Sequence, residues 1–151
     1  MAENFEFELV SPERLLLSEP VEMVVIPGAE GDFGVLPGHS PMITGVRTGV
    51  ISIYEGGNVN RRIFVAGGFA EVTTERCTVL AEQAVALEDT DRASAEARIK
   101  QAEEALSAAD TDSGRETAEA ALDTARALLA AVDAHGKGPI TSKGPVGKGG
   151  R

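Results

Sequence analysis

The sequence predicts an α+β chain in which an N-terminal antiparallel β-sandwich is followed by a C-terminal antiparallel α-helical hairpin and a disordered tail. Three observations predict this order. Apolar residues mostly alternate at period two in residues 1–86, recur every three or four residues in 87–134, and have no period in 135–151. The last segment is rich in Gly, Lys and Pro, a composition that favours disorder. We therefore expect three parts with boundaries at these positions.

The amino-terminal segment is expected to fold as short strands. Residues 5–9 alternate apolar and acidic side chains, so their apolar members share one face of a strand. Glycine-rich connections at 55–58 and 66–68, and a short polar one at 73–75, indicate that consecutive strands pair as hairpins in a two-sheet domain. The expected strands are 5–9, 13–17, 21–26, 34–36, 42–46, 49–54, 60–65, 69–73 and 76–81.

The second segment carries the apolar period of two helices. Each helix has a seam, mostly of alanine, and the pattern breaks between them at residues 109–114. Ser113 and Glu116 match a capping box that would start the second helix, so the two helices should pack as a hairpin. Because burying Ala gains less than burying Leu, we expect the hairpin to open more easily than the sandwich unfolds. The seams are Ala95, Ile99, Ala102, Leu106 and Ala109, then Ala118, Leu122, Ala125, Leu129 and Val132.

Charge disfavours a nucleic-acid partner. The chain has a formal net charge of −10 at pH 7, and residues 1–86 and 87–134 each carry 12 acidic and 5 basic residues. The four bases of residues 135–151 are too sparse to form a patch. Nucleic-acid binding depends on Lys and Arg that neutralise phosphates, so we expect none.

The single cysteine and the lengths of the apolar runs bear on where in the cell the chain is located. Cys77 has no partner for an internal disulfide or a zinc motif, which predicts an intracellular chain without a metal. It lies within a strand pattern, so we expect a buried thiol. The sequence has no signal peptide pattern and no apolar run long enough to span a membrane.

The densest motif is the glycine- and proline-rich segment at residues 27–41. Its four glycines permit unusual backbone angles and its three prolines fix φ, so we expect a specified loop that presents Asp32 and His39. A histidine that only bonds within its own turn is an equal alternative for His39. No nucleophile lies nearby, and a second histidine at metal-ligand spacing is missing. The G-x-x-G-x-x-G spacing also fails to match a dinucleotide or phosphate loop.

This segment carries a family resemblance. The run G-x-x-G-x-x-G-V-L-P-G-H-x-P, followed by Thr44 and by Gly-Val-Ile at 49–51, resembles the epsilon subunit of bacterial F-type ATP synthases, whose mitochondrial counterpart is called delta. The likeness covers roughly residues 4–134. It implies a non-catalytic central-stalk subunit that links the gamma subunit to the membrane rotor ring and couples proton flow to ATP synthesis. It also implies a peripheral location on the cytoplasmic side of the bacterial inner membrane, reached only through the complex, and no cofactor.

The resemblance assigns partner contacts to the loop. His39 matches the position that faces gamma, and Asp32 matches the acidic position that faces the polar loops of the rotor ring. The implied contact surface is Glu30, Asp32, Pro37, Gly38, His39, Ser40 and Pro41.

A second element bears on nucleotide binding. Asp89, Arg92 and Ala93 match a D-x-x-R-A element that helps bind ATP in some members of the family. Here Glu88 replaces the apolar residue that precedes the element, and its carboxylate would repel phosphates. A plain helix start, capped by Asp89 or Thr90, is the alternative, and we expect no bound nucleotide.

The second helix bears on inhibition. In inhibitory relatives it carries basic residues that grip an acidic segment of the catalytic beta subunit. Residues 113–134 here hold two arginines against four acids, so a weak inhibitor or none is predicted, with contact to alpha or beta left open.

A protein of another class remains an alternative. A free-standing ligand-binding or adapter sandwich could dimerise through the alanine seam of its hairpin. An enzyme is the least favoured class, because no nucleophile, base and orienting group can be assembled from the candidate residues.

Overall fold

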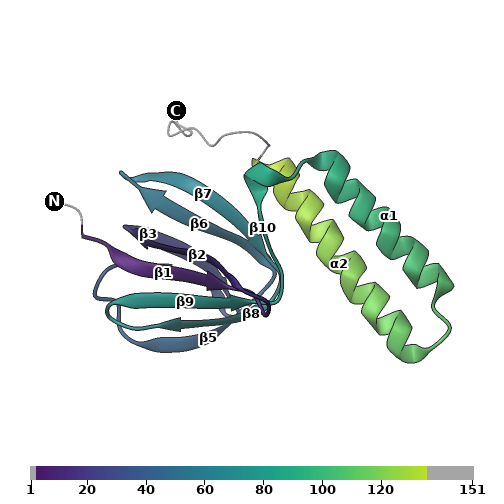
Figure 1. Ribbon diagram of the computed structural model, residues 1–151, viewed down its shortest axis with the longest axis horizontal. Coiled ribbons are helices and arrows are strands. Elements are labelled where there is room, and N and C mark those ends of the chain that lie inside the picture. Colours follow the sequence, from purple (N-terminus) through teal and green to yellow (C-terminus); the bar gives the residue numbers. More distant parts are fainter. Residues whose placement is uncertain (1–2, 136–151) are drawn as a thin grey trace. The chain divides into compact units, whose positions relative to one another are not determined.

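The computed structural model describes residues 3–135, which form the strands and helices of Figure 1. The chain divides into two compact units between Ala86 and Leu87, and each is described here by itself. The tail predicted at 135–151 lies outside the described residues except for His135, which is the last residue of the second long helix.

The first unit contains a strand at or near each expected position, and the α+β fold class is confirmed. It also contains a short strand that the pattern did not predict, because its three residues are too few to show a period. The strands are β1 (Phe5–Val10), β2 (Leu15–Val21), β3 (Met23–Gly28), β4 (Gly31–Val35), β5 (Met42–Val46), β6 (Gly49–Glu55), β7 (Asn58–Val65), β8 (Gly68–Val72), β9 (Arg76–Ala81) and β10 (Ala84–Ala86).

The strands form one continuous hydrogen-bonded sheet in the order β10-β7-β6-β3-β5-β8-β9-β1-β2, with β4 paired to β3. The sheet folds back on itself as a sandwich, so that β2 and β6 are in contact (Figure 1). All its pairings are antiparallel except that of β1 with β9, which is parallel and departs from the expected antiparallel arrangement. A sequence pattern cannot reveal this pairing, since the two strands are far apart in the chain.

The hairpin expected at residues 66–68 is wrong. Strand β7 pairs with β6 and β10, whereas β8 pairs with β5 and β9. Gly67 and Gly68 have φ of +74° and +133°, and a Cβ on Gly68 would lie 1.9 Å from the Leu80 carbonyl oxygen. Glycine is therefore required here because β8 approaches β9 closely. In the sequence, glycines required for this reason look the same as glycines that form a turn.

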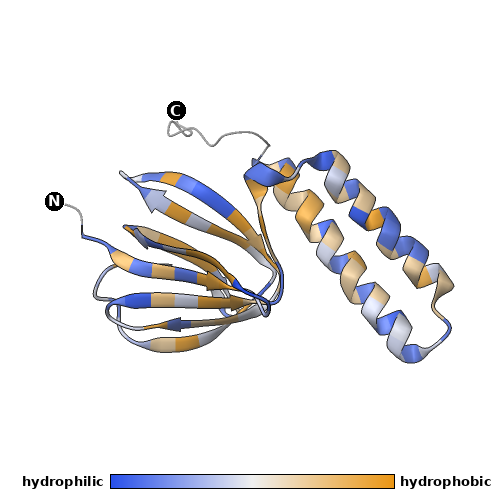
Figure 2. Cartoon of the chain, in the orientation of Figure 1, coloured by the Kyte–Doolittle hydropathy of each residue, from blue (hydrophilic) through white to orange (hydrophobic). Residues whose placement is uncertain are grey.

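Alternation along the strands places the core between the layers (Figure 2). Phe5, Phe7 and Leu9 are buried on one face of β1, as predicted. Cys77 is also buried, and burial raises the pKa of its thiol to about 12. The largest fully buried side chains of this core are Phe7, Leu9, Val21, Val24, Ile26, Val35, Ile51, Ile53, Val65 and Val72.

The second unit contains a short 3-10 helix, η1 (Leu87–Asp89), and the long helices α1 (Arg92–Ala108) and α2 (Asp112–His135), which pack against each other. The expected caps are wrong at both starts. Asp91 caps α1 by accepting a hydrogen bond from Ser94 N at 2.9 Å, because Asp89 already belongs to η1.

The second helix starts earlier than the capping box predicted. Thr111 Oγ1 accepts a hydrogen bond from Gly114 N at 2.9 Å, which makes Thr111 the cap. The Ser113 carbonyl already accepts a bond from the Thr117 hydroxyl inside the helix. Ser113 therefore lies inside the first turn of α2, and the capping box predicted for Ser113 and Glu116 does not form.

The buried seam agrees with the predicted one at most positions of α2 and fewer of α1. Leu128 is fully buried in place of the predicted Leu129, because the helix takes a step of three residues where the pattern suggested four. Ala109 lies beyond α1 as its extended C-cap. The buried residues are Ala95 and Ala102 on α1, and Ala118, Leu122, Ala125, Leu128, Ala131 and Val132 on α2.

Candidate docking surfaces

The segment at residues 27–41 is divided by β4, which was expected at 34–36 but begins earlier, at Gly31. Strands β3 and β4 pair from Val24↔Val35 to Gly28↔Gly31, which leaves Ala29 and Glu30 as a two-residue turn. We call residues 28–32 the hairpin tip. Asp32 is the second residue of β4, and the four steps from it to Leu36 at the start of the next loop span about 13 Å at ~3.3 Å per residue, so β4 separates Asp32 from the loop that holds His39.

The hairpin tip is held by a residue that the sequence did not single out. Arg47, in the turn between β5 and β6, donates from Nη1 to the Gly28 carbonyl at 2.5 Å and from Nη2 to Asp32 Oδ1 at 2.5 Å. Its backbone N also donates to the Pro27 carbonyl at 2.9 Å. The Asp32 carboxylate is thus ion-paired within the chain. The one available signal was that Arg47 is the only Lys or Arg between Arg14 and Arg61.

Glu30 differs from Asp32 in this respect. It lies exposed in the turn, and within residues 3–135 it makes no hydrogen bond or ion pair. The tip therefore carries one acidic group that is paired internally and one that is not.

The rest of the predicted contact surface forms the loop between β4 and β5, residues 36–41. His39 N donates to the Leu36 carbonyl at 3.0 Å, and Gly38 N donates to the Thr74 carbonyl at 3.1 Å, which ties the loop to the β8–β9 turn. His39 Nδ1 lies 2.7 Å from the Ser40 carbonyl oxygen, so an Nδ1–H tautomer donates within its own turn. The loop residues Gly38, Ser40 and Pro41 are exposed, whereas Pro37 and His39 are partly buried.

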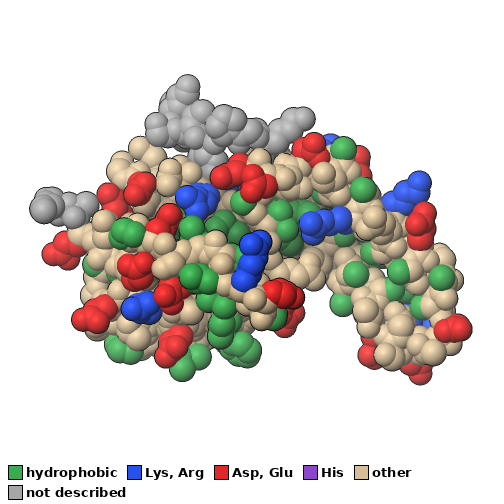
Figure 3. All heavy atoms as spheres, in the orientation of Figure 1, with side chains coloured by type: hydrophobic (Ala, Val, Ile, Leu, Met, Phe, Trp, Pro, Cys, Tyr) green, Lys and Arg blue, Asp and Glu red, His purple; other side chains and the backbone are tan. Residues whose placement is uncertain are grey.

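An exposed apolar surface lies on the outer side of the sandwich. Leu15, Ile43, Phe69 and Leu80 are 55%, 73%, 61% and 54% exposed, and we call these four residues the apolar face. Cross-strand pairing aligns Phe69 with Leu80, Leu80 with Val10, and Val10 with Leu15, so the row crosses β8, β9, β1 and β2. Figure 3 shows hydrophobic side chains exposed over this part of the sandwich.

The apolar face includes a shallow hollow and was not anticipated from the sequence. The hollow has a volume of about 230 Å³. Phe69 and Leu80 occupy the solvent-facing phase of their strands, where polar residues are expected, and that mismatch was the available signal. The hollow is lined by Val10, Ser11, Pro12, Gly68, Phe69, Leu80, Ala81 and Glu82.

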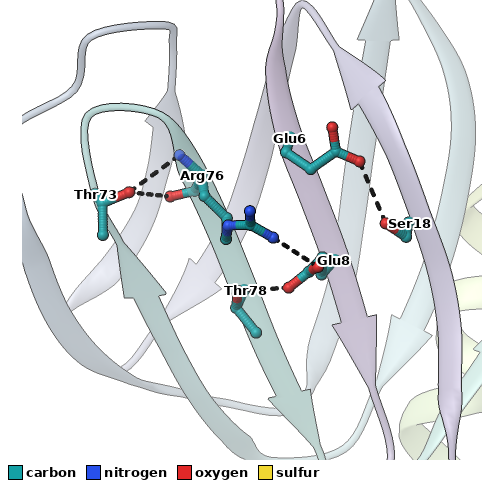
Figure 4. Close-up of polar contacts among 6 residues, drawn as sticks. All are labelled: Glu6, Glu8, Ser18, Thr73, Arg76 and Thr78. Carbon is teal, nitrogen blue, oxygen red and sulfur yellow. Dashed lines mark hydrogen bonds and ion pairs between the residues drawn. The ribbon is translucent and has the colours of Figure 1, made fainter.

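Polar side chains occupy the neighbouring part of the same outer surface (Figure 4). Glu8 pairs with Arg76 at 2.7 Å and accepts from the Thr78 hydroxyl at 3.1 Å. Glu6 accepts from the Ser18 hydroxyl at 3.2 Å. These polar groups are paired with one another across β1, β2 and β9 by hydrogen bonds and an ion pair. The side chains of the apolar face, in contrast, are exposed rather than covered by other described residues.

In the element that matches the family's nucleotide-binding residues, the arginine already forms ion pairs within the chain. Arg92 Nη1, at the start of α1, donates to Asp133 near the end of α2, and Arg92 Nε lies 3.2 Å from Glu96 Oε2. The hydrogen bond to Asp133 raises the pKa of Arg92 above its ordinary value. Of the other two positions, Asp89 ends η1 and Ala93 lies in the first turn of α1. No cluster suited to a metal ion occurs within residues 3–135.

Comparison with known proteins gives a consistent family. The model described as "ATP synthase, Delta/Epsilon chain, beta-sandwich domain" matches residues 4–87. The ATP synthase epsilon chain of Rhodospirillum rubrum is 57% identical over 131 residues, which cover 87% of this chain and 98% of that relative. The epsilon chain of Paramagnetospirillum magneticum is 55% identical over 132 residues, with coverage of 87% and 99%.

Solved structures are similar in fold. A chain of the Euglena gracilis mitochondrial ATP synthase, in an OSCP/F1/c-ring structure, superposes with a TM-score of 0.68 at 29% identity and covers 85% of this chain and 81% of its own. A chain of the Tetrahymena thermophila central stalk/c-ring structure has a TM-score of 0.57 at 18% identity, with coverage of 86% and 97%. None of the helices in residues 3–135 has the length and apolar character needed to cross a bilayer.

Proposed function

This chain belongs to the ATP synthase delta/epsilon chain family, and we propose on this premise that it links the gamma subunit to the membrane rotor ring and so couples proton flow to ATP synthesis. It is a non-catalytic central-stalk subunit of an F-type ATP synthase. Residues 1–86 serve as the docking domain and 87–134 as an appended hairpin. The complex places it on the cytoplasmic side of the bacterial inner membrane.

The apolar face carries this proposal. Four large side chains, each more than half exposed, lie on neighbouring strands of a rigid sheet. Contiguous exposed apolar surface marks protein contacts, and the centre of an interface is depleted in charge. The proposed occupant is gamma, because the family is built into the central stalk and because the neighbouring polar side chains of Glu6, Glu8 and Arg76 already have partners.

The two parts of the predicted contact surface are assigned to different neighbours. The tip, with Glu30 and Asp32, faces the polar loops of the rotor ring. The loop with Pro37, Gly38, His39, Ser40 and Pro41 lies at the other end of β4 and faces gamma. A span of about 13 Å along β4 from Asp32 to Leu36, at ~3.3 Å per residue, supports this division.

The hairpin is proposed to inhibit weakly or not at all and to bind no nucleotide. Helix α2 carries Arg115 and Arg126 against five acids, and a negative helix is not attracted to an acidic surface. The Arg92 guanidinium is already engaged by two carboxylates. The adapter alternative loses its support, since α1 and α2 of one chain pack on each other and use the alanine seam.

Phe69 provides the test. Substituting Phe69→Ala should weaken binding to a gamma-containing soluble sector by about tenfold or more, because a large apolar side chain at the centre of an interface is a typical hot spot. The measurement is calorimetric titration of the full chain, with circular dichroism to verify folding. Glu55→Ala, an exposed residue at the end of β6 and away from the apolar face, is the control. Equal affinity of wild type and F69A would refute the assignment of this face to gamma.

A further inference from the structure

We infer that Arg47 is a positioning residue that fixes the hairpin tip so that Glu30, rather than Asp32, is the free acidic group offered to the partner. This rests on the proposed function, in which the tip faces the rotor ring. The structural basis is one guanidinium that bonds both strands of the hairpin.

The bonds of Arg47 span the tip. Gly28 and Asp32 lie on opposite strands, and the two terminal nitrogens of Arg47 each donate to one of them at 2.5 Å. The planar guanidinium can reach two acceptors at once, which a lysine ammonium on its flexible stem does not reproduce. Because Arg47 N also donates to the Pro27 carbonyl, the turn that carries Arg47 is fixed to the same hairpin.

Close packing restricts the tip further. Ala29 N donates to the Gly45 carbonyl at 2.8 Å, and a Cβ on Gly45 would meet Ala29 at 3.5 Å. A Cβ on Gly49 would meet Pro27 at 3.0 Å. Side-chain carbons of Pro27 and Ala29 thus lie against the glycines on either side of Arg47, so this packing and the arginine bonds hold the tip in one position.

This arrangement distinguishes the two carboxylates. For Asp32 to bond a partner it would have to share or release the Arg47 guanidinium. Glu30 gives up no bond within residues 3–135 when a partner donates to it.

The first measurement is amide hydrogen exchange on the full chain without partners. The reporter is the Ala29 amide, which donates to the Gly45 carbonyl. Arg47→Ala should speed its exchange by about fivefold, the scale of one exposed charge-assisted interaction, and Arg47→Lys should not restore the wild-type rate. The control is Arg61→Ala, which removes an equal charge from a looser pair with Glu19 at 3.6 Å. Unchanged exchange in R47A would overturn the inference.

The second measurement is affinity for the purified rotor ring assembled with gamma. Glu30→Gln should weaken binding by about threefold or more, whereas Asp32→Asn, whose amide oxygen still accepts from Arg47, should change it less. A larger loss for D32N than for E30Q would overturn the inference. If exchange rises in R47A while E30Q, D32N and R47A all bind the ring like wild type, the positioning role stands and the proposed ring contact fails.

Discussion

Gly68 is a position where the pairing of two strands depends on the absence of a Cβ atom. Its φ is +133°, and any Cβ would lie 1.9 Å from the Leu80 carbonyl oxygen. Gly68→Ala should lower the free energy of unfolding by more than ~2 kcal/mol, because both the backbone angle and the β8–β9 pairing would be disturbed. Urea denaturation of the full chain measures this.

A matched glycine separates the two causes. Gly56 has φ of +61° and open space around its Cβ position, so Gly56→Ala should lose only about 1 kcal/mol from the backbone angle. Equal losses for G68A and G56A would show that the approach of β8 to β9 is not the cause.

Cys77 predicts a pH dependence. Burial raises the pKa of its thiol to about 12, whereas an unfolded thiol titrates near ~8.5. Since the folded-state pKa is raised, the contribution of the neutral thiol is fully present below about pH 8.5 and is lost as pH rises toward 12. Within that window this group should lower the free energy of unfolding by up to ~1.4 kcal/mol per pH unit.

The comparison for Cys77 is Cys77→Ala, measured by urea denaturation from pH 8 upward. Other groups that titrate at high pH are common to both proteins, so only the thiol distinguishes the slopes. The variant should have the shallower decline. Parallel curves would contradict a neutral, buried thiol.

At the scale of elements, the start of α2 depends on Thr111. Its hydroxyl accepts from Gly114 N at 2.9 Å, so Thr111→Ala should destabilise the hairpin by ~1 kcal/mol. Ser113, the cap expected from sequence, lies inside the first turn, and Ser113→Ala should have little effect. Amide exchange in α2 reports on both. A greater effect of S113A would mean that the helix begins where the capping box placed it.

The elements that could be predicted from sequence are those defined by a local period. Alternation in Phe5–Val10 gave the buried face of β1, and the spacing of Ala118, Leu122 and Ala125 gave the seam of α2. The parallel β1–β9 pair and the three-residue strand β10 could not be predicted, since they depend on contacts distant in sequence or on too few residues.

The candidate site divides in the same way. Glycines and prolines marked the segment that holds Glu30 and His39, but the strand expected at 34–36 begins earlier, at Gly31, and its pairing with β3 was not anticipated. The Arg47 bond to Asp32 joins residues 15 apart in the chain, and no local pattern encodes it. The apolar face joins side chains from four strands, so it becomes visible only once the register is known.

At the scale of the molecule, docking and regulation are proposed to belong to different units. The family model covers residues 4–87, and the apolar face and the hairpin tip both lie within them. Removing the second unit is therefore expected to leave assembly intact. Deleting residues 88–151 tests this together with the proposed lack of inhibition.

In the assembled soluble sector, that deletion should change ATP hydrolysis by less than about twofold, because α2 carries more acids than bases and gains nothing from an acidic surface on beta. The matched variant reverses three exposed acids of α2, as Glu116→Lys, Glu119→Lys and Asp123→Lys in the full chain. If charge decides inhibition, this triple variant should hydrolyse ATP more slowly than wild type, with the difference shrinking at high salt. A large rise in hydrolysis on deletion would mean that the hairpin inhibits despite its charge, through contacts other than electrostatic ones.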